Sequence, residues 1–193
     1  MKKCVSAVLC IALALSICTH ATAATPDELW LAAESLREQG IMVGDQTGSL
    51  HLDDSLTRAE LAAILCRLRV NQEHIAAEEA LYTRYCTFPD VPEWARVYVG
   101  YCAFNGLMVG YDTGAFGASD SVTPAAACTV VLRHLGISGW DYETACQTAL
   151  DLNLTTPAAV AAESVTRGDV AVMLYRALNT VPSDAELPQD TDS

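Results

Sequence analysis

The sequence predicts an all-α protein built from three helix-loop-helix repeats, and two repeated patterns support this fold class. The segment Gly40-Ile41-Met42-Val43-Gly44 recurs sixty-six positions later as Gly106-Leu107-Met108-Val109-Gly110. The segment Leu56-Thr57-Arg58-Ala59-Glu60 has a more divergent copy, Val165-Thr166-Arg167-Gly168-Asp169. One unit of this kind cannot bury its apolar face alone. We therefore expect three helical units that pack around a shared core.

Residues 1–23 have the pattern of a signal peptide. Met1-Lys2-Lys3 is a positive start, Val5 to Ile17 is an apolar stretch, and Ala21-Thr22-Ala23 is a small-x-small cleavage pattern. The apolar stretch is too short to span a bilayer, so the sequence predicts export. A lipoprotein signal with its lipid on Cys18 is disfavoured, because Ile17 stands where such signals have a small residue.

The first repeat is expected to span residues 24–70. Apolar residues at helical spacing predict a helix from Pro26 to Gln39, and Gly40 is typical of a helix C-terminus. After a loop, Thr57 is expected to open a second helix. Thr57 and Glu60 have the spacing of a capping box, in which the cap contributes about 1 kcal/mol.

Residues 71–86 are predicted to be an inserted helical linker, followed by the second repeat at 87–137 and a degenerate third repeat at 138–179. The second helix of repeat 2 is expected to follow Thr123, with Pro124 at its first position, where a missing N–H costs nothing. Ala149 and Asn153 are aligned with the two glycines of the earlier copies, and asparagine tolerates a left-handed backbone. Residues 180–193 are predicted to be a disordered acidic tail.

The composition argues against several kinds of partner. The chain has 193 residues, of which 51% are hydrophobic, which suits one domain of ordinary size. Its formal charge is −13, and removal of the signal peptide leaves nine arginines against 24 carboxylates, a charge of −15. Such a surface repels nucleic acid and anionic lipid, and no later segment could span a membrane, so we expect neither partner. An acidic ligand would have to be bound by particular arginines, whose planar fork matches a carboxylate.

Five cysteines follow the signal peptide, and their spacing fits no zinc site. We therefore expect no metal and no cofactor. Export permits disulfides, whereas the apolar helical surroundings of several cysteines favour buried, unpaired thiols, and the sequence leaves the choice open. The cysteines are Cys66, Cys86, Cys102, Cys128 and Cys146.

The repeats resemble the S-layer homology (SLH) repeat. The resemblance rests on Phe88-Pro89-Asp90-Val91, Trp94-Ala95, Gly106 to Gly110, Gly114-Ala115-Phe116 and Val122-Thr123, and on Leu56 to Glu60 as the signature at the start of a central helix. It extends over about residues 30 to 178.

The resemblance implies a pseudo-threefold spindle in which the threonine-led helices form a central three-helix bundle. It implies a secreted protein of the cell wall or cell surface of a Gram-positive-type bacterium. Members of the family bind secondary cell-wall polysaccharide without a covalent bond, often through a pyruvate ketal, in grooves between neighbouring repeats. Another exported protein is a second expected partner, because little of the chain is left to serve as an anchored payload.

The resemblance and the chemistry of such a groove together give a set of candidate ligand-binding residues. Arg58 and Arg167 lie in the first turn of capped helices, where a guanidinium and free N–H groups could meet one carboxylate. Glycines would allow close approach of a sugar, Trp94 would offer an apolar platform, and Asp90 would accept hydrogen bonds. The candidates are Gly44, Thr57, Arg58, Glu60, Asp90, Trp94, Gly110, Thr166, Arg167 and Asp169.

Each candidate also has a purely structural interpretation. The threonines are helix caps, the glycines are turn residues, Asp90 could cap the helix that carries Trp94, and a tryptophan is more often buried than exposed. The second signature, Thr123-Pro124-Ala125-Ala126, lacks both the arginine and the acidic residue. At most two grooves are therefore expected to keep their charged groups.

The sequence is compatible with two functions other than a binding module. One is a secreted structural or protein-interaction scaffold that has lost sugar binding, which the divergence of repeats 2 and 3 favours. The other is an exported enzyme, but His51, His74 and His134 are scattered and no nucleophile motif is present. We therefore expect a protein that is not an enzyme.

Overall fold

The computed structural model describes residues 23–180, which form helices joined by turns and loops, with isolated β-bridges and no sheet. This confirms the all-α class. The predicted signal peptide, except for Ala23, and the predicted tail, except for Thr180, lie outside the described residues. The helices are α1 (Pro26–Glu38), α2 (Arg58–Arg69), α3 (Gln72–Ala77), α4 (Glu79–Tyr85), the 3₁₀ turn η1 (Glu93–Ala95), α5 (Arg96–Phe104), α6 (Pro124–His134), α7 (Ala145–Asp151), α8 (Pro157–Ala161) and α9 (Arg167–Thr180).

Threonine hydroxyls begin the principal helices. Thr25, Thr57 and Thr123 precede α1, α2 and α6, and each side chain accepts a hydrogen bond from the N–H three residues later. The predicted capping box of α2 is complete, because the Glu60 carboxylate accepts from the backbone N–H of Thr57 at 2.9 Å. Thr166 and Asp169 make the same pair of contacts at the start of α9, at 2.8 and 3.0 Å.

Left-handed residues end the first helix of every repeat. Gly40 follows α1 with a φ of 69°, and Gly106 follows α5 with a φ of 64°. Asn153 takes this place after α7, with a φ of 53°, as the tolerance of asparagine for this region predicts. Its N–H donates to the carbonyl of Leu150, as those of Gly40 and Gly106 donate to the carbonyls three residues before them.

This geometry corrects one detail of the sequence alignment. Asn153 corresponds to the first glycine of each pair, Gly40 and Gly106, and not to the second. Leu154 then corresponds to Ile41 and Leu107, since each donates to a carbonyl five residues earlier. Ala149 is a fully buried residue of α7 and does not occupy a glycine position.

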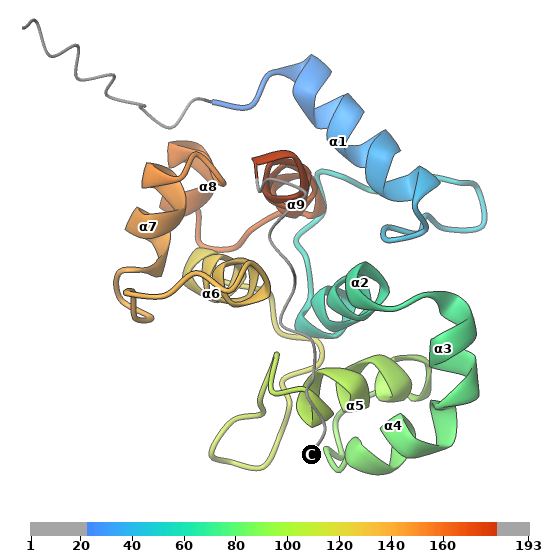
Figure 1. Ribbon diagram of the computed structural model, residues 1–193. Helices are drawn as coiled ribbons and strands as arrows, with labels where there is room; N and C mark the ends of the chain where they lie inside the picture. Colours follow the sequence, from blue (N-terminus) through green and yellow to red (C-terminus); the bar gives the residue numbers. More distant parts are fainter. Residues whose placement is uncertain (1–22, 181–193) are drawn as a thin grey trace, which may run out of the picture.

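The first helix of each repeat packs on the second helix of the repeat before it. Helix α5 lies against α2, α7 lies against α6, and α1 closes the arrangement by lying against α9. Figure 1 shows α2, α6 and α9 in the middle of the molecule, with the other helices around them. The first and last described helices are therefore neighbours.

A closed cycle of backbone hydrogen bonds joins the three repeats just before their threonine caps. Leu56 donates to Val165 at 3.0 Å, Val165 donates to Val122 at 2.9 Å, and Val122 donates to Leu56 at 2.8 Å. All three side chains are buried. The pseudo-threefold spindle stays a prediction, and this cycle supports it.

The predicted inserted segment is helical and forms α3 and α4. Helix α4 packs closely on α5, and the Tyr85 and Phe104 rings meet edge to face with centroids 4.8 Å apart. Tyr82 is buried beside them. Its hydroxyl is hydrogen-bonded to Nε2 of His74, 2.9 Å away. Among the helices of residues 23–180, none is long and apolar enough to cross a membrane.

Candidate functional site

The α2 groove is a cavity of about 240 Å³ to which all three repeats contribute. Helix α2 contributes most of the lining, and η1, the first residue of α9 and the loop after α1 contribute the rest. The lining residues are Val43, Glu60, Ala63, Ile64, Arg67, Trp94 and Arg167. The structure thus brings together Glu60, Trp94 and Arg167 from the set that the sequence predicts.

Glu60 and Arg67 both line the groove, and their spacing of seven positions, about two helical turns, puts them on the same face of α2. Glu60 uses one carboxylate oxygen for the capping box, where it accepts from the N–H and the hydroxyl of Thr57 at 2.9 and 2.8 Å. Its other oxygen faces Nη1 of Arg167 at 3.3 Å. The Glu60 carboxylate is therefore already paired on both sides.

Arg167 reaches the groove from the start of α9 while it holds the loop of repeat 1. Its Nε donates to the carbonyl of Leu50 at 2.7 Å, and its Nη2 donates to that of Val43 at 3.2 Å. The side chain is only 12% exposed. Arg167 is thus a structural residue whose guanidinium also forms part of the groove wall.

Arg67 lines the groove, although the sequence analysis did not include it among the ligand candidates. Its guanidinium stacks 4.7 Å from the ring centre of Tyr98, and its Nη2 donates to the Tyr98 hydroxyl at 3.1 Å. The signal was present in the sequence, because an arginine stands ten positions after each of the three capping threonines. Arg67 thus stands seven positions, about two helical turns, after Glu60 on the same face of α2.

Trp94 lies on the other side of the groove with 53% of its surface exposed. The interpretation of Trp94 as a core residue is therefore wrong. It lies in η1, whose next residue Ala95 is fully buried, so the short turn is fixed by the core while the indole remains accessible.

The groove is locally positive in a strongly acidic protein. Two guanidinium groups, of Arg67 and Arg167, face one carboxylate, that of Glu60. The whole chain has a formal charge of −13. An anionic ligand is therefore favoured here by nearby charges, while repulsion from more distant carboxylates is screened by salt beyond about 8 Å.

Arg58 has the same structural role as Arg167 but is not among the residues that line the α2 groove. It donates to the carbonyls of Val109 and Phe116, both at 2.9 Å, which correspond in the repeat to Val43 and Leu50. Its guanidinium also lies 4.8 and 4.9 Å from the ring centres of Tyr111 and Phe116. Arg58 therefore holds the loop of repeat 2.

Asp90 also holds this loop. Its carboxylate accepts from the N–H groups of Phe116, Gly117 and Ala118 at 2.7 to 2.9 Å. Desolvation raises the pKa of Asp90, but these N–H donors outweigh it and hold the pKa below its ordinary value. The suggestion that Asp90 caps the helix of Trp94 is wrong, because Pro92 precedes η1.

Gly44 and Gly110 allow their loops to fold back on themselves. A Cβ atom on Gly44 would lie 2.8 Å from the backbone of Gly48 and Ser49. On Gly110 it would lie 2.4 Å from the Phe88 ring and 2.8 Å from the Ala115 carbonyl. Close backbone contact within each loop thus explains both glycines.

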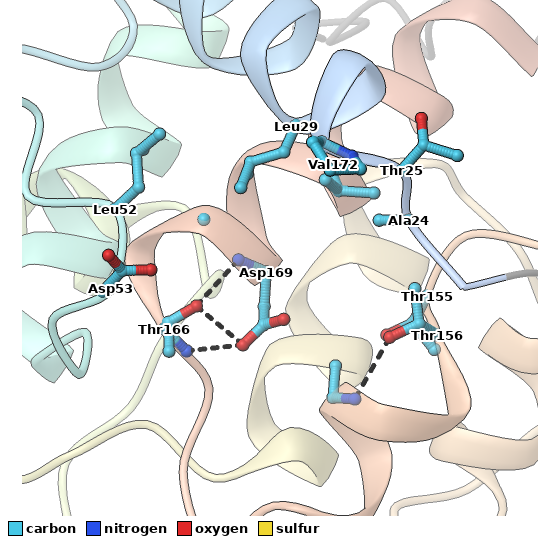
Figure 2. Close-up of a pocket in the computed structure, with 13 residues that line it drawn as sticks. Ala24, Thr25, Leu29, Leu52, Asp53, Thr155, Thr156, Thr166, Asp169 and Val172 are labelled. Atoms are coloured by element: carbon cyan, nitrogen blue, oxygen red, sulfur yellow. Dashed lines mark hydrogen bonds between the residues drawn. The ribbon is translucent and has the colours of Figure 1, made fainter.

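The α9 groove is the corresponding cavity beside α9, with a volume of about 300 Å³ (Figure 2). Hydroxyls and carboxylates dominate its polar lining, among them Thr155, Thr156, Thr166, Asp53 and Asp169. Among the described residues that line it there is no arginine. It therefore offers no cation to an acidic ligand.

The arginine that corresponds to Arg67 is engaged elsewhere at this end of the molecule. Arg176 makes a two-pronged ion pair with Glu28, with N–O distances of 2.6 and 2.8 Å, and its side chain is 7% exposed. Glu28 stands at the position that Trp94 has in repeat 2. The hydrogen bonds from Arg176 and its charge hold the pKa of Glu28 below its ordinary value, although burial opposes this.

The start of the third helix of this kind, α6, lacks the charged first-turn residues of α2 and α9. Pro124 stands where Arg58 and Arg167 stand, and Ala126 stands where Glu60 and Asp169 stand. Of the three helix starts, α2 alone combines an acidic cap partner, an arginine of the neighbouring repeat and an exposed tryptophan.

The histidines and acidic residues do not converge on one centre. His51 contacts Asp45 at 2.8 Å, and His74 contacts Tyr82. Nδ1 of His134 accepts a hydrogen bond from Nε of Arg69 at 3.2 Å. Burial lowers the pKa of His134 to about 4, so this ring is neutral at physiological pH. No group of three or more potential metal ligands occurs within residues 23–180.

Comparison with known proteins shows that the chain is similar to cell-wall and surface-layer proteins. No family model matches it. It is 28% identical over 192 residues to the middle cell wall protein of Brevibacillus brevis, a match that covers 92% of this chain and 18% of that protein. It is 29% identical over 144 residues to the surface layer protein of Brevibacillus choshinensis, covering 70% of this chain and 13% of that protein.

A third relative is cell surface glycoprotein 1 of Acetivibrio thermocellus, which is 33% identical over 92 residues, 48% of this chain and 4% of that protein. The chain thus spans less than a fifth of the length of each of these relatives. The similarities confirm the predicted kinship with surface-layer and cell-wall proteins, and they are consistent with an SLH-domain protein.

Proposed function

We propose that this chain is a non-catalytic cell-envelope module that binds secondary cell-wall polysaccharide in the α2 groove. The observation that carries the proposal is the meeting of two arginines and an exposed tryptophan around one cavity, with residues from all three repeats. The similarity to cell-wall and surface-layer proteins supports a role at the cell surface.

The ligand that this chemistry fits is a saccharide bearing a carboxylate, such as a pyruvate ketal. A guanidinium can donate two parallel charge-assisted hydrogen bonds to a carboxylate. The Trp94 indole offers an apolar surface of the kind that packs against a sugar ring. Glu60 does not repel such a ligand strongly, because Arg167 and the Thr57 cap already neutralise and occupy its oxygens.

We further propose that the α2 groove is the main binding site of the described chain. The α9 groove has no lining arginine, and its counterpart arginine is bound to Glu28. Beside α6, Ala126 stands in place of Glu60, and Asp141 stands in place of Trp94 when Asn153 is aligned with Gly106. One saccharide bound per chain is the expected stoichiometry.

Co-sedimentation with purified peptidoglycan sacculi tests the proposal, with sacculi that retain or lack their attached polysaccharide. The wild type is expected to sediment only when the polysaccharide is present. Trp94→Ala and Arg67→Gln should each reduce the bound fraction at least several-fold, since each removes a side chain that lines the groove. Trp30→Ala is the control, because Trp30 is also exposed but lies on α1 outside the α2 groove.

The alternative function, a scaffold that has lost sugar binding, predicts a different outcome. A folded wild type that does not sediment with either kind of sacculi would support the scaffold. Equal sedimentation with and without the polysaccharide would point to peptidoglycan itself as the ligand.

A further inference from the structure

Cys128 and Cys146 lie side by side across the packing of α6 on α7. Helix α6 packs directly on α7, and the Cys146 side chain lies close enough to Cys128 to raise the pKa of the Cys128 thiol. Cys128 is buried, whereas Cys146 is partly exposed at the start of α7. The contact crosses from the second repeat to the third, because α6 ends repeat 2 and α7 begins repeat 3.

The repeat register places both cysteines at positions that are buried in the equivalent helix pair of the preceding repeat. Cys128 corresponds to Ala62 of α2, sixty-six positions earlier, and Cys146 corresponds to Val99 of α5 when Asn153 is aligned with Gly106. Ala62 and Val99 are both fully buried in the matching α2–α5 pair. The same two positions of the packed helix pair thus hold alanine and valine in one repeat and two cysteines in the next.

The other cysteines have different surroundings. Cys66, Cys86 and Cys102 are buried, and Cys102 donates its S–H to the carbonyl of Ala62 at 3.5 Å. Burial raises the pKa of Cys66 to about 12 and also raises that of Cys86. These three thiols are therefore shielded from solvent and from oxidants.

We propose that Cys128 and Cys146 are a disulfide-forming pair that covalently joins the second and third repeats under oxidising conditions. The inference is independent of the proposed polysaccharide binding. An exported protein meets such conditions, and the signal-peptide pattern predicts export.

The oxidant is a disulfide, either a small molecule or a thiol-disulfide oxidoreductase. The more exposed Cys146 thiolate attacks one sulfur of this disulfide, which forms a mixed disulfide and releases one thiolate. Cys128 then loses its proton to solvent, and its sulfur attacks Sγ of Cys146, which releases the second thiolate. Overall, two protein thiols are oxidised to one disulfide and the oxidant is reduced to two thiols.

Burial, with a smaller effect of the neighbouring Cys146, raises the pKa of Cys128 to about 12. The second step should therefore be slow at neutral pH and should accelerate as the pH rises, because the thiolate is the nucleophile.

Thiol counting on the chain that begins at residue 24 tests the proposal. The reduced, folded protein is incubated with oxidised glutathione, then denatured, alkylated with iodoacetamide and weighed by mass spectrometry. We expect five alkylated cysteines before oxidation and three after it, with no glutathione retained. The thermal midpoint should rise on oxidation, because a bond across the eighteen positions from Cys128 to Cys146 restricts the unfolded chain.

The double variant Cys128→Ala with Cys146→Val is the matched control, because it installs the pair that α2 and α5 already use. It should fold and show three alkylated cysteines with or without the oxidant. Its thermal midpoint should be the same before and after incubation with the oxidant. The proposal is overturned if the oxidised wild type keeps five alkylated thiols or retains a glutathione. It is equally overturned if the double variant still loses two thiols on oxidation.

Discussion

Arg58 and Arg167 occupy the same position in two repeats, and each holds the loop of another repeat by two backbone carbonyls. Arginine at the start of a helix opposes the helix dipole, so its presence there needs a compensating contact. The structure supplies that contact as hydrogen bonds between repeats. Ligand binding is therefore not required to explain either arginine.

Arg58→Ala should lower the free energy of unfolding by about 1–3 kcal/mol, because the partly buried Phe116 carbonyl and the exposed Val109 carbonyl lose a charged donor and two aromatic rings lose a cation. Urea denaturation followed by circular dichroism measures this. Arg133→Ala is the control, since Arg133 is exposed in the last turn of α6, and it should change stability little. Equal losses in both variants would show that Arg58 does not hold the loop.

Asp90 gives the protein a pH-dependent contribution to stability. Its pKa in the folded state lies below the ordinary value of 3.8, so the carboxylate stabilises the fold above that value and ceases to do so as the pH falls through the folded pKa. Asp90→Asn should lower the thermal midpoint near neutral pH and should reduce the further drop between about pH 5 and pH 3. An unchanged drop in this acid range would rule out Asp90 as a contributor.

At the scale of single elements, the helix ends show which glycines the fold needs and why. Gly106 is left-handed at the end of α5, but a Cβ atom there would meet nothing within 4 Å. Gly106→Ala should therefore lower the free energy of unfolding only through strain in the left-handed backbone, by about 1–2 kcal/mol. Gly110→Ala should cost more, because its Cβ atom would overlap the Phe88 ring and the Ala115 carbonyl. Urea denaturation of the two variants checks this order, and a smaller loss for Gly110→Ala would contradict it.

The elements were predictable from the sequence because their signals are local. Capping threonines, the left-handed residue after each first helix and the apolar spacing of the helices all act within a few residues. The sequence alone pairs Asn153 with the second glycine of the earlier repeats, whereas the structure pairs it with the first. The difference arises because the hydrogen bond from Asn153 to Leu150 cannot be read from sequence.

The candidate site was predictable only in part, because it depends on contacts between elements far apart in the chain. Glu60 and Arg167 were found through the repeated signature, but their ion pair joins positions more than a hundred residues apart. The exposure of Trp94 depends on how η1 packs beside the groove. The ion pair between Arg176 and Glu28 depends on the packing of α1 against α9. Neither follows from composition or periodicity.

At the scale of the whole molecule, the chain closes on itself. Helix α1 packs on α9, and the cycle through Leu56, Val165 and Val122 joins all three repeats. A solenoid of repeats has contacts between successive neighbours alone, whereas this arrangement makes each repeat depend on both others. We therefore expect residues 24–180 to unfold in one cooperative transition.

Deletion of residues 167–193 tests this cooperativity, because it removes α9 and leaves α1 without its partner. The shortened chain should lose its cooperative melting transition and not behave as two folded repeats. Calorimetry of both chains measures this. Separate transitions in the intact protein, or a sharp transition in the shortened one, would contradict the closed arrangement.

The central claim is that one groove, beside α2, binds the polysaccharide of the cell wall. Isothermal titration of polysaccharide fragments released from sacculi into wild type, Trp94→Ala and Trp30→Ala tests it most directly. The account predicts one fragment bound per wild-type chain, binding lost or strongly weakened in Trp94→Ala, and binding unchanged in Trp30→Ala. Full-strength binding to a folded Trp94→Ala protein, or two equivalent sites per chain, would contradict it.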